Sequence, residues 1–304
     1  MKVQALFYLA AIALLAGCAD EQPDWPKQRI VVIGDIHADI NAARRAFQLA
    51  DATNERDEWI GGDLVVVQLG DFIGRSYEDR EVLDFILEMR KKAKAGGGRV
   101  HALIGNHEVF GARLELRWVP DEAYPAFSDI PGLDLDNPHL AELPEYKRAR
   151  SAALMPGGYY SKQLAEFPAV LRLGETIYVH GGVTPHWAKY GIDRINGEVS
   201  QWFAGRTKEP TSAQGMDAGN FDDSVMMSRH FSEDVDENDC VMLEKSLKIL
   251  NAKRMIVAHS VQNSITARCD DKVWAVDVGM SRYYGGDLQV LEIIGDDILS
   301  VIEY

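Results

Sequence analysis

Residues 65–76, "VVVQLGDFIGRS", form an apolar run that ends in Gly70-Asp71 and is followed by Arg75. The β-branched run predicts a buried strand, and the glycine allows the backbone to turn sharply where the strand ends. An ordinary turn would explain this segment on its own. A metal-ligating carboxylate beside an anion-binding arginine would explain it equally, so the rest of the sequence has to decide between these two interpretations.

Two other segments of the first half have the same pattern. "RIVVIGD" (29–35) and "RVHALIGNHE" (99–108) are predicted strands. The intervening segments 40–50 and 78–98 have the spacing of amphipathic helices, and the second has acids in its first turn, bases in its last turn and glycines at its end. Three apolar strands separated by helices predict a parallel sheet that is covered on both faces.

The second half has a different pattern, with alternating runs around short turns. Three segments are predicted hairpins: 169–182, 265–281 and 288–304. Residues 240–253 form a predicted helix that leads into a strand at 254–260. Prolines and acids interrupt the periodicity at about 117–150, which we interpret as an irregular insert at the rim. Residues 29–304 are therefore expected to form one α/β domain with two sheets packed face to face.

The composition limits the number of domains and the kind of partner. The chain has 304 residues, 46% of them hydrophobic, which is enough for one large core or at most two smaller ones. Its formal net charge of -15 argues against sequence-independent binding to nucleic acid, because such binding needs a basic face. Any anionic substrate must be attracted by local positive charge.

The first residues have the features of an export signal. An apolar run from Ala5 to Ala16 is too short for a typical spanning helix and ends in Leu15-Ala16-Gly17-Cys18. This ending resembles the cleavage box of bacterial lipoproteins, so residues 1–17 are the predicted signal peptide, Cys18 the acylated residue and 18–28 the anchor and spacer. The protein is then expected to be exported and anchored to a membrane, facing the periplasm. A plain secretion signal or an apolar core segment remains an alternative.

The other two cysteines allow two interpretations. In an oxidising compartment, Cys240 and Cys269 could form one disulfide, or each could be a separately buried thiol. The sequence does not decide between these alternatives. Neither cysteine belongs to a Cys-x-x-Cys pair, so a metal or nucleophile site is not indicated.

A polar group follows each of five predicted strands, where a buried core would need none. These groups are Gly34-Asp35-Ile36-His37, Gly70-Asp71, Gly105-Asn106-His107-Glu108, His180-Gly181-Gly182 and His259. Ligands bind beyond the carboxyl ends of strands in open α/β sheets, so these side chains are expected to converge on one crevice. Asp, His and Asn supply oxygen and imidazole donors, which suit zinc, manganese or iron better than calcium. The set could hold two metal ions with Asp71 as the bridging ligand.

These five motifs, in this order, resemble those of the calcineurin-like metallophosphoesterases, and the resemblance covers nearly everything from Arg29 onward. Four further segments are similar to those of the bacterial-type Shewanella-like protein phosphatases, a branch of the phosphoprotein phosphatases. They are "WIGGDLVVVQLGD" (59–71), "SRHF" (228–231), "KRMIVAHSVQ" (253–262) and "KVWAVDVGMSRYYGG" (272–286). The family fold is a sandwich of two mixed sheets flanked by helices, which agrees with the elements predicted above.

The resemblance also implies roles for individual residues. The implied metal ligands are Asp35, His37, Asp71, Asn106, His180 and His259, with Asp71 shared by two divalent or trivalent ions (manganese, iron or zinc). Arg75 would hold the phosphate oxygens, and His107 would protonate the leaving oxygen. Arg229 is the best candidate for a second phosphate clamp, with Arg194 and Arg282 as alternatives.

The expected function is that of a metal-dependent phosphomonoesterase acting on phosphorylated protein or peptide. The bacterial-type branch includes enzymes with tyrosine preference, so we expect phosphotyrosine to be preferred. One alternative is a phosphoanhydride hydrolase, such as a dinucleoside tetraphosphatase, and another is a lapsed enzyme that binds phosphoprotein without hydrolysing it. A phosphodiesterase of the same superfamily fits less well, because those usually end in Gly-His-x-His, whereas Ser260 and Val261 follow His259.

One residue departs from the family pattern Gly-Asp-x-x-Asp-Arg, because Gly74 stands where the second Asp is expected. In the family that carboxylate hydrogen-bonds the histidine beside the ligating asparagine. Here His107 has no such partner by sequence, although Asp79 or Glu108 could substitute. We therefore expect turnover reduced on the scale of about 10 to 100-fold, or the use of another acid.

Overall fold

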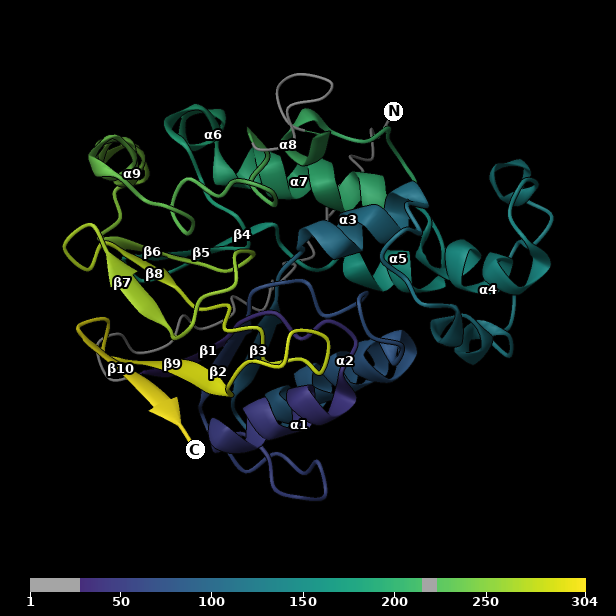
Figure 1. Cartoon of the computed structure of the whole chain (residues 1–304), viewed down its shortest axis with the longest axis horizontal. Helices are drawn as coiled ribbons and strands as arrows, with labels where there is room; N and C mark the ends of the chain where they lie inside the picture. Colours follow the sequence, from purple (N-terminus) through teal and green to yellow (C-terminus); the bar gives the residue numbers. More distant parts are fainter. Residues whose placement is uncertain (1–27, 215–222) are drawn as a thin grey trace, which may run out of the picture.

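The computed structural model describes residues 28–214 and 223–304, and it contains two five-stranded sheets packed face to face (Figure 1). The strand orders are β10-β9-β1-β2-β3 and β4-β5-β6-β8-β7. This is the expected α/β sandwich of two mixed sheets. The predicted signal peptide, residues 1–17, and most of the spacer lie outside the described residues.

The first sheet confirms the predicted parallel core. Strands β1 (Arg29–Ile33), β2 (Val65–Gln68) and β3 (Arg99–Ala102) are parallel, and β1 aligns Ile30 with Val65 of β2. β1 and β2 are buried on both faces except at Arg29, which explains their continuous apolar sequences. The C-terminal hairpin, β9 (Gln289–Ile294) and β10 (Ile298–Glu303), extends this sheet antiparallel to β1.

The second sheet contains the other two predicted hairpins. These are β4 (Val170–Leu173) with β5 (Thr176–Val179), and β7 (Thr266–Arg268) with β8 (Val273–Ala275). Between them lies β6 (Arg254–Val257), which is parallel to both β5 and β8. The carboxyl ends of β5 and β6 therefore lie side by side.

Helices cover the outer faces of both sheets. Figure 1 shows α1 (Ile40–Leu49) and α2 (Asp79–Ala95) against the first sheet, and α6 (Pro185–Tyr190), α7 (Ile192–Phe203) and α9 (Glu237–Leu250) against the second. The shorter helices are α3 (Asn106–Arg113), α4 (Glu145–Leu154), α5 (Tyr159–Leu164) and α8 (Thr211–Gln214). No helix in the described part of the chain is both long and apolar enough to cross a membrane.

The prediction of a strand over 99–108 is wrong in its second half. β3 ends at Ala102, and helix α3 begins at Asn106. The helix begins there because the side chain of Glu108 reaches back and accepts a hydrogen bond from the backbone N–H of Gly105 at 2.8 Å. Apolar residues continue from the strand into the loop, so the sequence pattern hides this boundary.

The expected insert is only partly irregular. It contains three short 3-10 helices, Asp121–Ala123, Pro125–Phe127 and Pro138–Leu140, and then α4. Arg150 of α4 is buried and forms an ion pair with the buried Asp79 of α2 at 2.5 Å. This pair connects the insert to the main domain.

Cys240 and Cys269 form a disulfide, so the first of the two interpretations holds. Cys240 belongs to α9, and Cys269 lies in the turn between β7 and β8. The bond therefore joins a covering helix to the edge hairpin of the second sheet.

We predict that replacing both cysteines with serine lowers the free energy of unfolding by about 3 kcal/mol, because the bond closes a loop with a sequence separation of 29 residues. Urea denaturation of the oxidised wild type, the reduced wild type and the Cys240→Ser/Cys269→Ser variant measures this. The reduced wild type should match the double variant. Equal stability of all three proteins would contradict the prediction.

Candidate functional site

The polar groups predicted to converge do lie together. Asp35 and His37 follow β1, Asp71 follows β2, and Asn106 begins α3 just beyond β3. From the second sheet, His180 follows β5 and His259 follows β6. All are at least 92% buried, so the group occupies the carboxyl ends of strands from both sheets.

The carboxylate of Asp71 lies at the centre of this group. Its Oδ1 accepts a hydrogen bond from the backbone N–H of His107 at 2.8 Å. Its Oδ2 faces three imidazoles, at 3.4 Å from Nε2 of His180, 3.9 Å from Nε2 of His37 and 4.0 Å from Nε2 of His107. One oxygen therefore faces ligand atoms from both sheets, which is the position of a bridging ligand.

One half of the site consists of Asn106, His180 and His259. Nδ1 of His180 lies 2.9 Å from the carbonyl oxygen of Leu69, which can only accept, so Nδ1 has the proton. In a neutral ring Nε2 then presents its lone pair 2.9 Å from Oδ1 of Asn106. Nε2 of His259 is buried and has no hydrogen-bond partner. These electron-pair donors fit a metal ion.

The other half consists of Asp35 and His37, whose Oδ2 and Nε2 atoms are 3.5 Å apart. Oδ1 of Asp35 is buried without a hydrogen-bond partner. Asp277, which follows β8, is also buried, and its negative charge is close enough to raise the pKa of Asp35. The sequence analysis missed Asp277, although it is another acid just after a strand.

The electrostatics of the cluster favour bound cations. Burial, followed by the charge of Asp277, raises the pKa of Asp35 well above its usual value. Burial disfavours protonated His180, yet the carboxylates of Asp71 and Asp35 raise its pKa to about 9. Ligand atoms within 4.8 Å of one another form two triplets that share Asp71: His37, Asp71 and His107, and Asp71, His180 and His259. The residues therefore fit two metal ions.

His107 belongs to the first triplet, whereas the family resemblance places Asp35 there. Asp35 is the more suitable ligand, because it supplies a negative charge, its Oδ1 has no hydrogen-bond partner, and its Oδ2 lies beside Nε2 of His37. The backbone of His107 already supports Asp71.

The backbone at the site is strained. His37, Asp71, Arg75 and His259 all have positive φ, between 49° and 73°, which costs a non-glycine residue about 1 kcal/mol or more. Gly70 has a φ of 95° and passes so close to the backbone of Gly105 that a Cβ atom would collide. These conformations direct the side chains into one cluster.

Glu108 holds the strained loops in place. Its Oε2 accepts hydrogen bonds from the N–H groups of Gly105 and Asp71 at 2.8 and 2.9 Å, and its Oε1 from those of Phe72 and Ile73 at 3.1 and 3.3 Å. Burial and the charge of Asp71 raise the pKa of Glu108 to about 7, while the N–H donors favour the ionised form. One buried carboxylate thus joins the loops after β2 and β3.

Arg75 lies beside the cluster on an aromatic surface. Its guanidinium lies 4.0 Å from the ring centre of Trp118, with Tyr283 and Tyr284 at 5.3 and 5.8 Å. Its backbone N–H donates to the carbonyl of Trp118 at 2.8 Å. A cleft of about 150 Å³ joins Arg75, Trp118 and Tyr284 to Asp71, His37 and His259. The sequence analysis missed the aromatic residues, which come from the insert and the segment after β8.

The structure separates the three arginines proposed for a second clamp. Arg229 lines the same cleft and donates from Nη1 to the hydroxyl of Ser260 at 2.8 Å. Arg282 forms an ion pair with Asp39 at 2.8 Å, and Arg194 lies on the outer helix α7. Only Arg229 of these three lines the cleft.

The structure also shows what replaces the missing carboxylate at Gly74. The imidazole of His107 fills that space, because a Cβ atom on Gly74 would collide with its Nδ1. Asp79 instead accepts from the N–H of Gly74 at 2.6 Å and pairs with Arg150, and Glu108 binds backbone groups. Neither acid takes the place of the lost partner of His107. Burial lowers the pKa of His107 to about 3.

Comparison with known proteins agrees with this geometry. Residues 28–263 match the model of the family described as calcineurin-like phosphoesterase. The chain is 33% identical to Shewanella-like protein phosphatase 2 of Arabidopsis thaliana over 90% of this chain and 77% of the relative. It is 26% identical to Shewanella-like protein phosphatase 1 of Plasmodium berghei over 84% of this chain and 68% of the relative.

Among solved structures, the fold is similar to that of a cold-active protein-tyrosine phosphatase from a psychrophilic Shewanella species. The TM-score is 0.69 at 21% identity, and the match covers 91% of this chain and 81% of the other.

We predict that Glu108→Gln lowers the free energy of unfolding by about 3 kcal/mol, because an amide cannot accept hydrogen bonds at both ends and leaves buried N–H groups unpaired. Urea denaturation measures the loss, with the exposed Glu142→Gln as a matched control. If both variants unfold at the same denaturant concentration, Glu108 does not have this role.

Proposed function

The chain belongs to the calcineurin-like phosphoesterase family and, within it, to the Shewanella-like protein phosphatases, so it is a metal-dependent hydrolase of phosphate monoesters; we propose that it dephosphorylates proteins or peptides, with preference for phosphotyrosine. The main support is that Arg75 and Arg229 line the same cleft as the bridging-type carboxylate of Asp71. A phosphate held by these arginines would lie over the metal ligands.

The residues of the cleft would have different roles in the reaction. Arg75 supplies planar donors that suit two phosphate oxygens, and Trp118 supports it from one side. Arg229 would bind the phosphate from the segment beside β6. His107, whose Nε2 lies 4.0 Å from Oδ2 of Asp71, is the candidate donor of a proton to the leaving oxygen. Its lowered pKa, about 3, means that the negative charge of the bound phosphate would have to favour its protonated form.

The metal ligands orient the ions for this reaction. Asn106, His180 and His259 would hold one ion, Asp35 and His37 the other, and Asp71 both. When bound, two such ions acidify water, neutralise phosphate charge and stabilise the attacking and leaving oxygens. The Nδ1–H of His180, bonded to the carbonyl of Leu69, directs the Nε2 lone pair toward the site. Manganese, iron and zinc all suit these ligands.

The aromatic residues around Arg75 support the preference for phosphotyrosine. A phenyl leaving group could lie against Trp118 and Tyr284, whereas the short side chains of phosphoserine and phosphothreonine could not reach the same surface. The similar Shewanella structure is that of a protein-tyrosine phosphatase, which agrees with this proposal.

We also propose that the protein is exported, acylated at Cys18 and anchored facing the periplasm. The support is the sequence ending Leu15-Ala16-Gly17-Cys18 after an apolar run. The disulfide between Cys240 and Cys269 agrees with an oxidising compartment.

The proposal predicts that the full chain, loaded with manganese, hydrolyses a phosphotyrosine peptide with kcat/KM at least about tenfold higher than a phosphoserine or phosphothreonine peptide. Asp71→Asn should lower this activity at least about 100-fold, because it removes the shared negative ligand. Asp63→Asn, at an exposed residue, is the control and should leave activity unchanged.

Other outcomes would replace the proposal. Cleavage of dinucleoside tetraphosphate but of no peptide would favour the phosphoanhydride hydrolase. Peptide binding without hydrolysis, in a protein that contains about two metal ions per chain, would favour a lapsed enzyme.

A separate prediction concerns Gly74, whose φ is 76° and which has no room for a Cβ atom beside His107. Gly74→Ala and Gly74→Asp should both lower kcat by about tenfold or more, because the side chain displaces His107. Gly132→Ala is the matched control, since Gly132 also has a positive φ but no atom within 4 Å of the added Cβ. A Gly74→Asp variant faster than wild type would show instead that the missing carboxylate limits the reaction.

A further inference from the structure

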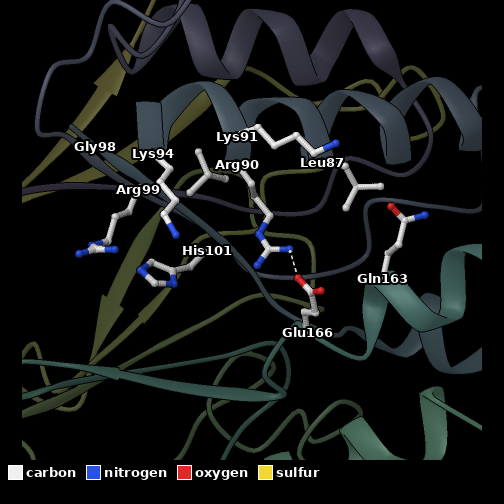
Figure 2. A pocket seen from close by; sticks show the side chains of 10 residues that line it. Leu87, Arg90, Lys91, Lys94, Gly98, Arg99, His101, Gln163 and Glu166 are labelled. Atoms are coloured by element: carbon white, nitrogen blue, oxygen red, sulfur yellow. Dashed lines mark hydrogen bonds and ion pairs between the residues drawn. The ribbon is translucent and has the colours of Figure 1, made fainter. Parts of the chain in front are cut away.

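A second concave site lies between α2 and the edge strand β3, and it shares no lining residue with the cleft of Arg75. We call it the basic groove (Figure 2). Its volume is about 440 Å³, and its lining residues are Leu87, Arg90, Lys91, Lys94, Gly98, Arg99, Val100, His101, Gln163 and Glu166. The four residues from α2 have the spacing of one helix face.

The basic groove has an excess of positive charge on a chain with a net charge of -15. Arg90, Lys91, Lys94 and Arg99 are cationic, and only Glu166 is acidic. Arg90 pairs with Glu166 at 3.4 Å. Lys91 and Lys94 are exposed and have no ion-pair partner in the described ranges 28–214 and 223–304.

Helix stability alone does not explain these charges. A lysine in the last turn of a helix, such as Lys94, interacts favourably with the helix dipole. Arg99 belongs to β3, however, and Arg90 lies before the last turn of α2. Lys91 and Lys94 lie one turn apart on the same face of α2 and repel one another, and an anionic ligand would remove that repulsion.

The arrangement of the cations suits an extended ligand. Figure 2 shows Arg99, Lys94 and Arg90 following one another along the groove, with Lys91 directed along the helix toward Leu87. A site for one phosphate group would bring such cations to a single point. Here the charges are spread along the groove, beside the apolar side chains of Leu87 and Val100.

The backbone of β3 also favours a peptide ligand. β3 pairs only with β2, and the N–H groups of Arg99 and Leu103 donate to the carbonyls of Leu64 and Gln68 at that side. Because backbone groups alternate along a strand, those of Val100 point away from β2, on the side of the groove. An edge strand of this kind can accept an added strand.

We propose that the basic groove binds an extended acidic segment of a partner protein, with carboxylates paired to Lys91 and Lys94 and an apolar side chain against Leu87. This interaction is independent of phosphate hydrolysis and of the metal site. A partner held here would be recruited by its unphosphorylated sequence.

The test measures binding of a fluorescein-labelled peptide, Glu-Glu-Leu-Glu-Glu-Leu, to the full chain by fluorescence anisotropy at low salt. The same peptide with Gln in place of Glu is the ligand control. Lys91→Glu/Lys94→Glu should weaken binding of the acidic peptide at least about tenfold, and the neutral pair Lys91→Gln/Lys94→Gln should give an intermediate Kd. The peptide contains no phosphate, so failure of the proposed catalysis would not affect this result.

The matched protein control is Lys245→Glu/Lys248→Glu, because these exposed lysines have the same spacing on α9 and give the same change in net charge. It should change Kd by less than about twofold. Equal weakening in both charge-reversed variants would overturn the proposal, as would equal binding of the Gln peptide. Stronger binding of inorganic phosphate or of anionic phosphatidylglycerol vesicles through Lys91 and Lys94 would also overturn it, since the ligand would then not be a peptide.

Discussion

The carboxylate of Glu108 is the contact on which the geometry of the metal site depends. It accepts hydrogen bonds from the N–H of Asp71 in the loop after β2 and from the N–H of Gly105 in the loop after β3. The carbonyl of Asp71 in turn accepts from the N–H groups of Ile36 and His37, which connects the loop after β1. These bonds offset the cost of left-handed backbone at His37 and Asp71. Without them, each loop would be free to adopt a conformation that separates the ligands.

Buried negative charge is the second constraint. Asp35, Asp71, Asp277 and Glu108 are all at most 2% exposed and lie near one another. In an apolar interior such a group is unfavourable unless cations compensate for it. The raised pKa of His180, to about 9, shows that the site attracts positive charge even when only a proton is available. Two metal ions would provide that charge and remove the need for this proton.

The sequence predicted the parts of the fold that depend on local pattern. Continuous apolar runs identified β1 and β2, and strand-end polar groups identified the residues that gather around Asp71. The start of α3 was missed, because its signal is the side chain of Glu108 rather than a change in hydrophobicity. The aromatic surface under Arg75 could not be predicted, since Trp118 comes from an insert without periodicity.

The insert is more than an irregular rim, because it helps to hold the backbone of residues beside the cleft. The carbonyl of Trp118 binds the N–H of Arg75, and the buried pair of Arg150 and Asp79 holds the N–H of Gly74. Arg75 is thus held directly by the insert, and Gly74 is held by Asp79 of α2, which pairs with Arg150 of the insert. Burying an unpaired Arg150 or Asp79 would be costly, so the pair fixes α4 against α2. Because the insert also supplies Trp118, one segment determines both the position of Arg75 and part of the aromatic surface beside it.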